Sequence, residues 1–409
     1  MCAKRTTFHG GKTMIGIAIL GFGVVGSGVE EVISMNNDFY AERLCGEKID
    51  VKYILDRRSF PDHPLADRVT TDFDKIIADP EVLIVVETMG GSHPAYEFSM
   101  AALKAGKSVV TSNKEVVSNY GTELLRVAAE NNVSYMFEAS VGGGVPVIKP
   151  MWQCLAANRI ESVCGILNGT TNYILTEMFK KEETFENALA EAKRLGYAEA
   201  NPAADIEGLD TSRKICILSS LAYGHAISPD KVKYEGMTDI DSTDVRFAET
   251  LGYSIKFLGR SERVGERVYC ITAPFFVPLD NPISSVEDVY NGITVRGNAV
   301  GDVMFYGRGA GKLPTASAVM SDVLDIARHC TDSASWKEAV PGELMDCEDF
   351  ELSMFVRTSS SEEEIFSVYP EACVTEADGL YGFITPKEPE RTIRKKTENL
   401  SDVKVIRVL

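Results

Sequence analysis

Residues 15–26 decide the fold, and they read Ile-Gly-Ile-Ala-Ile-Leu-Gly-Phe-Gly-Val-Val-Gly. The apolar, β-favouring run 15–20 predicts a buried strand, and a helical pattern begins among the glycines that follow it. Such glycines permit a tight turn and close approach of the backbone to a pyrophosphate, while the helix N-terminus offers amide donors to the phosphates. The stretch therefore predicts a dinucleotide-binding turn made of Gly21, Phe22, Gly23, Val24, Val25 and Gly26.

Strand and helix patterns alternate from this turn to about residue 135. Buried strands are also predicted at 49–55, 82–86, 108–111 and 133–137, and helices near 24–35, 72–78, 94–105 and 119–131. This alternation is typical of a parallel sheet with helices on both faces. We therefore expect an α/β protein in which residues 14–135 form a Rossmann domain with a doubly wound parallel sheet. Residues 1–13 are expected to be a flexible leader.

The pattern changes after the glycine-rich stretch 139–148. Long helices then mix with strand patterns that suggest an antiparallel or mixed sheet, and we expect an α+β domain over 136–330. A helix predicted at 314–327 opens with proline in its first turn and is expected to pack back toward the nucleotide domain. A polar linker, 331–347, would lead to 348–409, whose predicted βαββαβ order suggests a small ferredoxin-like module.

The composition excludes several functional classes. The chain has 42 basic and 60 acidic residues, and its net charge of -18 would repel a nucleic-acid backbone. No apolar run reaches the roughly 20 residues that cross a bilayer, and none resembles a secretion signal. The nine cysteines and five histidines show no zinc or redox spacing. We therefore expect a cytoplasmic protein that binds neither nucleic acid nor membrane.

Three charged residues follow the second predicted strand, where the adenosine ribose of a dinucleotide is expected. The carboxylate of Asp56 can accept both ribose hydroxyls and favours NAD(H). The guanidinium groups of Arg57 and Arg58 can pair with a 2′-phosphate and favour NADP(H). Because two cations outnumber one carboxylate, we expect NADP(H) more than NAD(H). A solvated charged turn is the structural alternative.

Two lysines are the candidate catalytic residues. Lys114 follows a predicted strand at the carboxyl edge of the sheet, where ligands bind. Asp210 and Lys214 stand four residues apart at a helix start and share one face. As a structural feature, this is an ion pair worth about 0.5 kcal/mol. As a functional one, Lys214 donates a proton to an oxyanion while Glu199 and Asp210 hold an ammonium group.

Seven stretches together resemble the homoserine dehydrogenase family over nearly all of residues 14–330. They are GFGVVG (21–26), VVETMGG (85–91), TSNK (111–114), FEASVGGGVPVI (137–148), GILNGTTNYIL (165–175), AKRLGYAEANPAADIEGLDTSRK (192–214) and YGRGAGKLPTASAV (306–319). The resemblance implies NAD(P)-dependent, reversible reduction of L-aspartate 4-semialdehyde to L-homoserine, a step of threonine, methionine and isoleucine biosynthesis. It also implies a homodimer or higher homo-oligomer, with 136–330 as the catalytic and dimerisation domain and 348–409 as an ACT-like module.

The resemblance also implies roles for single residues. Lys214 would be the proton donor in carbonyl reduction, and Lys114 would help to orient and protonate the substrate. The substrate-binding residues would be Glu199, Asp205, Asp210, Asn168, Gly169, Thr170, Thr171 and Tyr197. The further cofactor contacts would be Thr88, Lys114, Gly196 and Gly311. A sodium ion would be held by the carbonyls of Glu138, Val141, Gly143 and Val145, and a bare glycine-rich bridge is the competing interpretation.

Two other functions are alternatives to this one. A non-catalytic dinucleotide sensor would keep the glycine turn but would have no use for Lys214 and the acids around it. Another semialdehyde dehydrogenase, of the kind that uses a cysteine nucleophile with a histidine partner, is the second alternative. Nothing in the sequence marks such a pair.

Overall fold

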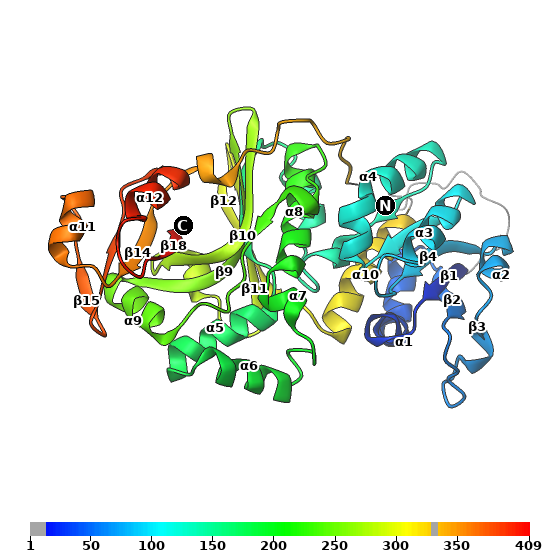
Figure 1. Cartoon of the computed structure of the whole chain (residues 1–409). Helices are drawn as coiled ribbons and strands as arrows, with labels where there is room; N and C mark the ends of the chain where they lie inside the picture. Colours follow the sequence, from blue (N-terminus) through cyan, green and yellow to red (C-terminus); the bar gives the residue numbers. More distant parts are fainter. Residues whose placement is uncertain (1–13, 329–333) are drawn as a thin grey trace. The chain divides into compact units, whose positions relative to one another are not determined.

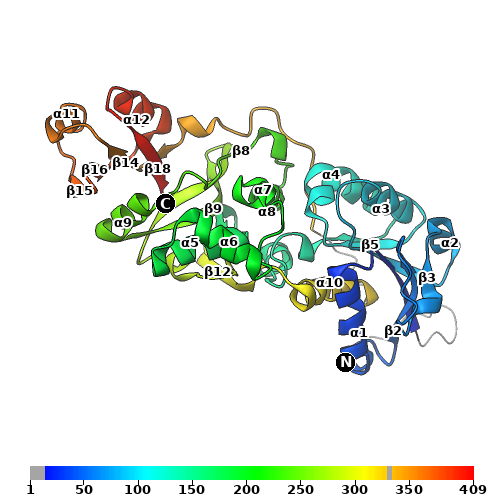
Figure 2. The same cartoon turned by 60° about the horizontal axis from the view of Figure 1, so that its bottom comes forward.

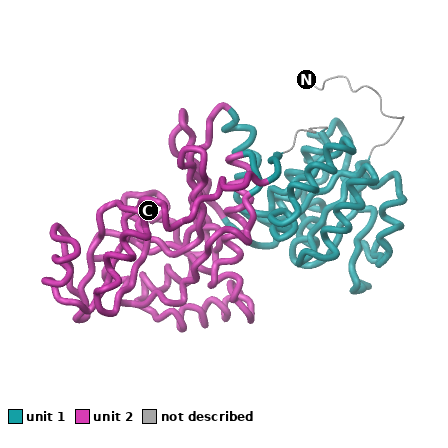
Figure 3. The backbone as a smooth tube through the Cα atoms, turned by 45° about the horizontal axis from the view of Figure 1, so that its top comes forward, with its two compact units in different colours: residues 1–156, 224–226, 308–338 teal, residues 157–223, 227–307, 339–409 magenta. Residues whose placement is uncertain are grey.

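The computed structural model describes residues 14–328 and 334–409, so the leader predicted at 1–13 lies outside the described residues. The chain divides into two compact units (Figure 3). Unit 1 comprises Met1–Ala156, Gly224–Ala226 and Arg308–Glu338, and unit 2 comprises Ala157–Tyr223, Ile227–Gly307 and Ala339–Leu409. Each unit has its own sheet and hydrophobic core.

Unit 1 contains a parallel six-stranded sheet in the order β3-β2-β1-β4-β5-β6. Figure 1 labels its strands β1, β2, β3 and β4. This is the strand order of doubly wound dinucleotide-binding domains, and it confirms the predicted Rossmann sheet. The strands are β1 (Met14–Leu20), β2 (Lys48–Leu55), β3 (Val69–Thr70), β4 (Val82–Glu87), β5 (Ser108–Thr111) and β6 (Tyr135–Met136). The sequence patterns did not predict β3, and β6 is shorter than the strand expected at 133–137.

Helices cover both faces of this sheet, with α1 and α10 on one face and α3 and α4 on the other (Figure 2). The α-helices are α1 (Val24–Arg43), α2 (Phe73–Ala78), α3 (Ala95–Lys104), α4 (Lys114–Glu130) and α10 (Lys312–Ala327). Shorter turns are the 3-10 helices η1 (Ala66–Arg68) and η2 (Glu138–Ser140) and the π-helical turn η3 (Pro150–Cys154).

The division into units differs from the predicted boundaries at 135 and 330. Residues 136–156 and α10 belong to unit 1, although the sequence interpretation placed both in the second domain. The physical reason lies in the core, where Val319 and Val323 of α10 are buried in one cluster with Ile17 and Val29. Burial of this apolar face holds the helix on the nucleotide-binding sheet, as expected for 314–327 from the sequence.

Unit 2 is built on a ten-stranded mixed sheet in the order β12-β11-β7-β9-β10-β18-β14-β16-β15, with β8 paired to β10. Its first strands are β7 (Ile160–Ile166), β8 (Lys233–Tyr234), β9 (Tyr253–Val264), β10 (Arg267–Pro278), β11 (Tyr290–Gly297) and β12 (Gly301–Arg308). The carboxyl-terminal strands are β14 (Met354–Thr358), β15 (Thr375–Ala377), β16 (Leu380–Ile384) and β18 (Lys404–Val408), and a separate pair is β13 (Glu351–Leu352) with β17 (Glu388–Pro389).

The helices of unit 2 carry the second half of the sequence motifs. They are α5 (Gly169–Lys181), α6 (Phe185–Arg194), α7 (Ala203–Ile206), α8 (Leu209–Tyr223), α9 (Ser242–Leu251), α11 (Glu362–Val368) and α12 (Glu390–Thr397). The 3-10 turns are η4 (Pro229–Lys231), η5 (Pro282–Ser285) and η6 (Cys347–Asp349). Helix α8 packs on β7, β9 and β10, and eleven of its fifteen residues are buried, Asp210 and Lys214 among them.

The carboxyl-terminal segment continues this sheet instead of forming the separate module expected for 348–409. Apart from the two-residue strands β13 and β17, its elements follow the predicted βαββαβ order. However, β18 pairs in parallel with β10, with Phe276 opposite Val408. The stacked rings of Phe276 and Phe355 join the two parts in one apolar core. The region expected to be a polar linker is also partly packed, because Met345 and Cys347 are buried in a core cluster of unit 2. An ACT-like role for this segment stays a prediction.

Candidate active site

In unit 1 the glycine turn has the geometry that the motif predicts. Gly21 has a φ of +87°, which favours glycine, and a Cβ at Gly26 would lie 2.0 Å from the carbonyl oxygen of Gly21. A Cβ at Gly23 would meet no atom within 4 Å. The first and third glycines are therefore required by the turn itself, and the second keeps space open above it.

A pocket of about 600 Å³ opens beside this turn at the carboxyl edge of the sheet. It is lined by Gly21, Gly23, Leu55, Asp56, Arg57, Arg58, Thr71, Thr88, Met89, Gly90, His93, Pro94 and Phe98. Thr88, a predicted cofactor contact, donates its hydroxyl to the carbonyl oxygen of Gly21 at 2.7 Å. The structure thus brings Thr88 together with the glycine turn and the charged residues after β2.

Asp56 is the centre of the charged group after β2. Its carboxylate accepts the backbone N–H of Phe22 at 2.8 Å, and Arg58 binds both of its oxygens with Nε at 3.0 Å and Nη2 at 2.8 Å. The hydrogen bonds from Arg58 outweigh partial burial and lower the pKa of Asp56 well below its usual value. Arg57 is exposed and has no ion-pair partner among residues 14–328 and 334–409.

Lys114 is the first residue of α4, directly after β5, as the sequence pattern predicted. The side chain of Asn113 caps this helix by accepting the backbone N–H groups of Glu115 and Val116. The amide nitrogen of Asn113 also donates to the carbonyl oxygen of Gly91 at 2.7 Å. The start of α4 is therefore joined to the loop after β4.

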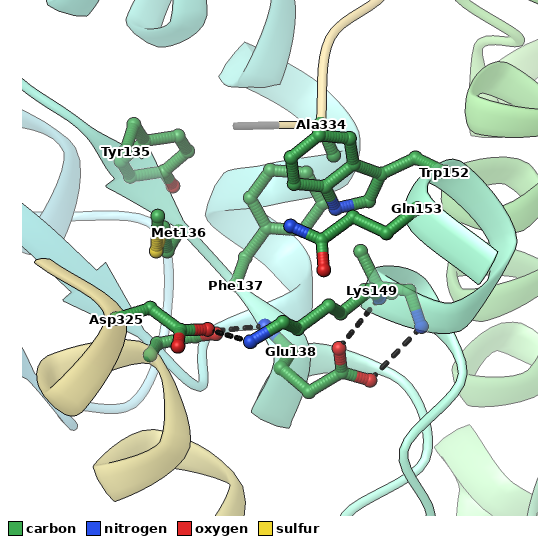
Figure 4. A pocket seen from close by; sticks show the side chains of 11 residues that line it. Tyr135, Met136, Phe137, Glu138, Lys149, Trp152, Gln153, Asp325 and Ala334 are labelled. Carbon is green, nitrogen blue, oxygen red and sulfur yellow. Dashed lines mark hydrogen bonds and ion pairs between the residues drawn. The ribbon is translucent and has the colours of Figure 1, made fainter. Parts of the chain in front are cut away.

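The glycine-rich segment 138–149 is a buried loop whose backbone is held by Glu138. The Glu138 carboxylate accepts the N–H groups of Val147, Ile148 and Lys149 at 2.7, 2.9 and 2.7 Å, and Lys149 reaches Asp325 of α10 (Figure 4). The backbone N–H of Glu138 donates to Asp322 at 2.9 Å. Burial raises the pKa of Glu138 and raises that of Asp322 well above its usual value.

The four carbonyls proposed for sodium lie in this loop. Glu138, Val141, Gly143 and Val145 are all buried, and outside the 3-10 turn none of their carbonyl oxygens accepts a hydrogen bond from residues 14–328 or 334–409. Gly143 has a φ of +56°, and a Cβ there would lie 2.1 Å from the carbonyl oxygen of Gly309. Buried carbonyls without donors carry an energetic cost that a cation would relieve.

Unit 2 contains a buried cluster around Lys214. The ammonium lies 2.7 Å from Asp210 Oδ2 and donates to the carbonyl oxygen of Leu167 at 2.7 Å. Lys214 is 8% exposed and Asp210 is 5% exposed. The pair is therefore buried, and it is not the weak surface ion pair that was the structural alternative in the sequence analysis. The shared helix face was predicted from the spacing, whereas the contact with Leu167 had no sequence signal.

Asn168 connects this cluster to Asp205. It caps α5 through the N–H of Thr171, and its amide nitrogen donates to Asp205 at 2.7 Å and to Asp210 at 2.9 Å. At the same helix start, Thr170 donates its hydroxyl to the carbonyl oxygen of Tyr197 at 2.6 Å. Of the predicted substrate residues, Asn168, Asp205 and Asp210 are thus linked next to Lys214. Gly169 and Thr171 lie in the first turn of α5 after Asn168, and Thr170 holds the backbone of Tyr197.

Three predicted site residues are not brought into these clusters. Glu199 is exposed and has no hydrogen-bond or ion-pair partner in the described part of the chain. Gly196 follows α6 with a φ of +77°, the usual conformation of a glycine that ends a helix. Gly311 precedes α10 with a φ of +127°. Their substrate and cofactor contacts stay predictions.

Two structural features are absent from the described residues. Across residues 14–328 and 334–409, no helix has the length and apolar character needed to cross a membrane. In the same ranges no three His, Cys, Asp or Glu side chains gather in an arrangement that could hold a metal ion. The second result concerns side chains, so it does not bear on the backbone carbonyls of the glycine-rich loop.

Two family models cover most of the chain. Residues 21–138 match the homoserine dehydrogenase NAD-binding domain, and residues 146–324 match the homoserine dehydrogenase domain. The chain belongs to the homoserine dehydrogenase family. A homoserine dehydrogenase from Synechocystis sp. is 42% identical over 325 residues, which are 78% of this chain and 74% of the relative.

Solved homoserine dehydrogenases have the same fold. The one from Thiobacillus denitrificans is 33% identical, with a TM-score of 0.89 over 97% of this chain and 98% of that one. A hyperthermophilic archaeal homoserine dehydrogenase in complex with NADPH is 27% identical, with a TM-score of 0.67 over 78% of this chain and 99% of that one. This homoserine dehydrogenase family member is therefore an oxidoreductase with a nicotinamide dinucleotide cofactor, and the matches do not support a non-catalytic sensor.

Proposed function

We propose that this chain catalyses the reversible reduction of L-aspartate 4-semialdehyde to L-homoserine, with Lys214 as the proton donor. The observation that carries the proposal is the buried ammonium of Lys214, held by Asp210 Oδ2 and the carbonyl oxygen of Leu167, each at 2.7 Å. A buried proton donor with a fixed position is what carbonyl reduction needs, because the oxygen gains negative charge as the hydride adds.

The residues of the cluster have separate tasks in this reaction. A nicotinamide dinucleotide held at the glycine turn 21–26 would supply the hydride for the aldehyde carbon of the substrate. The electron pair of the C=O bond moves to the oxygen, and Nζ of Lys214 gives that oxygen a proton. Asp210 holds the ammonium in place. Lys114, the first residue of α4 in unit 1, has the separate proposed role of orienting and protonating the substrate. In the oxidation of homoserine, the neutral amine of Lys214 takes the hydroxyl proton.

Asp205 is proposed to join Glu199 and Asp210 as a partner of the substrate ammonium group. It is half-buried and lies beside Asp210, because both carboxylates accept hydrogen bonds from the amide nitrogen of Asn168. Two carboxylates close together favour a cation between or beside them. An amino acid substrate supplies such a cation at one end and its aldehyde at the other, so this arrangement suits aspartate semialdehyde.

The proposed nucleotide is NADP(H), and the ion pair between Arg58 and Asp56 supports this choice. Because Arg58 and the N–H of Phe22 already occupy both oxygens of Asp56, ribose hydroxyls would have to displace them. Arg57 stands exposed at the same pocket, where its guanidinium can pair with a 2′-phosphate. The neutralised carboxylate and the available cation both favour the phosphorylated nucleotide.

Parallel assays of homoserine oxidation with NAD and NADP test the function and the nucleotide together. We expect activity with both and a higher kcat/KM with NADP. Arg57→Ala should lower kcat/KM for NADP about tenfold and leave NAD within about twofold, since one charge-assisted contact is lost. Arg43→Ala, at the distant end of α1, is the control. If neither nucleotide supports homoserine oxidation, the proposed function is refuted. If Arg57→Ala lowers kcat/KM equally for NAD and NADP, the NADP assignment is refuted.

The fit of the buried loop also supports a bound sodium ion. The carbonyls of Glu138, Val141, Gly143 and Val145 would hold it, and its charge would stabilise a loop rich in otherwise unpaired acceptors. A bound ion stabilises the folded state. Replacing choline chloride by sodium chloride at constant ionic strength should therefore raise Tm by about 2–5 °C. The rise should saturate with sodium concentration. Equal Tm values in the two salts would contradict a sodium site.

A homodimer or higher homo-oligomer is part of the same proposal. Half of the residues of the edge strand β12 are exposed, and its Tyr306 is 58% exposed. An exposed edge strand with an aromatic side chain invites pairing with another chain. A cytoplasmic location stays a prediction from composition.

A further inference from the structure

The loop after β4, residues 88–91, is in direct contact with the nucleotide turn. The Thr88 hydroxyl donates to the carbonyl oxygens of Leu20 and Gly21 at 3.0 and 2.7 Å. Met89 packs so closely that a Cβ on Gly21 would lie 2.9 Å from its Cγ. Thr88, Met89 and Gly90 also line the pocket beside the turn. The position of this loop therefore helps to set the shape of the turn and of the pocket.

One buried carboxyl group holds the loop. Glu87, the last residue of β4, is 0% exposed, and its Oε1 accepts the backbone N–H of Met89 at 2.7 Å. Its Oε2 accepts the hydroxyl of Thr111 on the neighbouring strand β5 at 2.6 Å. The Thr111 oxygen in turn accepts the backbone N–H of Asn113 at 2.9 Å. Glu87 thus connects the loop with the residues that start α4.

This chain of hydrogen bonds ends at Asn113, the residue before Lys114. The amide nitrogen of Asn113 donates to the carbonyl oxygens of Met89 and Gly91, at 3.3 and 2.7 Å, and its oxygen caps α4. The first residue of that helix is Lys114. A shift of the loop or of Thr111 would therefore move the backbone from which Lys114 projects.

A carboxyl group is a costly side chain for this position. Burial raises the pKa of Glu87 to about 7, although the hydrogen bonds from Thr111 and Met89 oppose the rise. The nearby Tyr135 of β6 is also buried, and its hydroxyl has no hydrogen-bond partner among the described residues. An apolar side chain would fill the space between strands without this cost. Stability alone therefore does not account for the carboxyl group.

We infer that Glu87 is a positioning residue, which holds the loop 88–91 in the shape that binds the dinucleotide and fixes the start of the helix that carries Lys114. The first part concerns nucleotide binding. The second part rests on the proposed role of Lys114, so the two need separate measurements.

Two variants of Glu87 test the first part through the Kd of NADPH and of NADH, measured by their fluorescence in the full-length enzyme. Glu87→Ala should raise Kd about tenfold, because the N–H of Met89 loses its acceptor. Glu87→Gln should stay within about threefold of the wild type, because its amide oxygen can accept that N–H and its nitrogen can donate to Thr111. Ser99→Ala is the control, since Ser99 is equally buried in unit 1 and its hydroxyl has no hydrogen bond to the described residues.

The outcomes separate positioning from a general effect on folding. A folded Glu87→Ala with the Kd of the wild type would overturn the inference, and so would a Gln variant as weak as the Ala variant. If Glu87→Ala does not fold, the Glu87→Gln variant still tests the inference. A tenfold or larger rise in its nucleotide Kd, with a Tm equal to that of Ser99→Ala, would overturn the inference.

Thr111→Val tests the second part. It removes the hydroxyl between Glu87 and Asn113 but keeps the carboxyl group that holds Met89. We expect kcat at saturating nucleotide to fall about fivefold or more, while the Kd for the nucleotide changes less than threefold. An unchanged kcat would overturn the connection to Lys114. The nucleotide Kd does not depend on the chemical step. A failure of the proposed reaction can therefore be distinguished from a failure of the inference about Glu87.

Discussion

Replacement of Lys214 by alanine is expected to lower kcat by a factor of about 100 or more, with little change in the Kd of the nucleotide. The developing alkoxide would lose its proton donor, and Asp210, only 5% exposed, would keep a charge without its lysine partner. Steady-state kinetics of aspartate semialdehyde reduction, followed at 340 nm, together with nucleotide fluorescence titration, measure the two quantities.

Lys214→Arg is the decisive companion variant. Arginine keeps the positive charge beside Asp210, but its guanidinium does not release a proton in proteins. We expect Lys214→Arg to recover the Tm that Lys214→Ala loses and to stay nearly inactive. Lys395→Ala, on the exposed side of α12, should behave as the wild type. Activity restored by arginine would mean that the lysine only completes a buried ion pair, and the proposed mechanism would then be wrong.

Arg407→Met is expected to lower the free energy of unfolding by about 3 kcal/mol or more. Arg407 is 1% exposed and binds Glu390, which is 0% exposed, through Nε at 2.8 Å and Nη2 at 2.7 Å. It also binds both oxygens of Glu235, at 2.6 and 2.9 Å. Its loss would leave a buried carboxylate with Arg394 as its remaining ion-pair partner among the described residues. Urea unfolding followed by circular dichroism measures the change.

The double variant Arg407→Met/Glu390→Leu separates the lost ion pair from the lost packing. It should recover part of the stability, because no unpaired buried charge remains. A loss below about 1 kcal/mol in the single variant would show that the carboxylates find other partners. The variant changes β18, which lies next to β10 in the sheet, so the two strands are expected to lose protection from hydrogen exchange together.

The same ion pair predicts how stability changes with pH. Burial alone would raise the pKa of Glu235, but the hydrogen bonds and charge of Arg407 outweigh it and lower the pKa to about 2, from a usual value of 4.5. The contribution of Glu235 is therefore complete above pH 4.5 and is lost as the pH falls toward 2. Urea unfolding between pH 5 and 2 should be less steeply pH-dependent in Arg407→Met than in the wild type. Equal slopes would contradict this assignment.

Features that depend on neighbouring residues were predictable from the sequence. The strand and turn at 15–26, the position of Lys114 after β5 and the shared face of Asp210 and Lys214 all follow from local spacing, and the structure has them. These patterns suffice because strand and helix periods place nearby side chains on known faces. The two-residue strand β3, which the sequence did not predict, shows the limit, because two residues are too few to show a period.

By itself, the sequence determined the parallel nucleotide-binding sheet, its glycine turn and the acid–lysine motif that also marks the family. Only the tertiary structure decided that β18 extends the second sheet and that Leu167 and Asn168 join the Lys214 cluster. The physical reason is that burial and hydrogen bonding act between groups close in space. The contact between Asn168 and Asp210, for example, spans 42 residues of chain, and no local period encodes it.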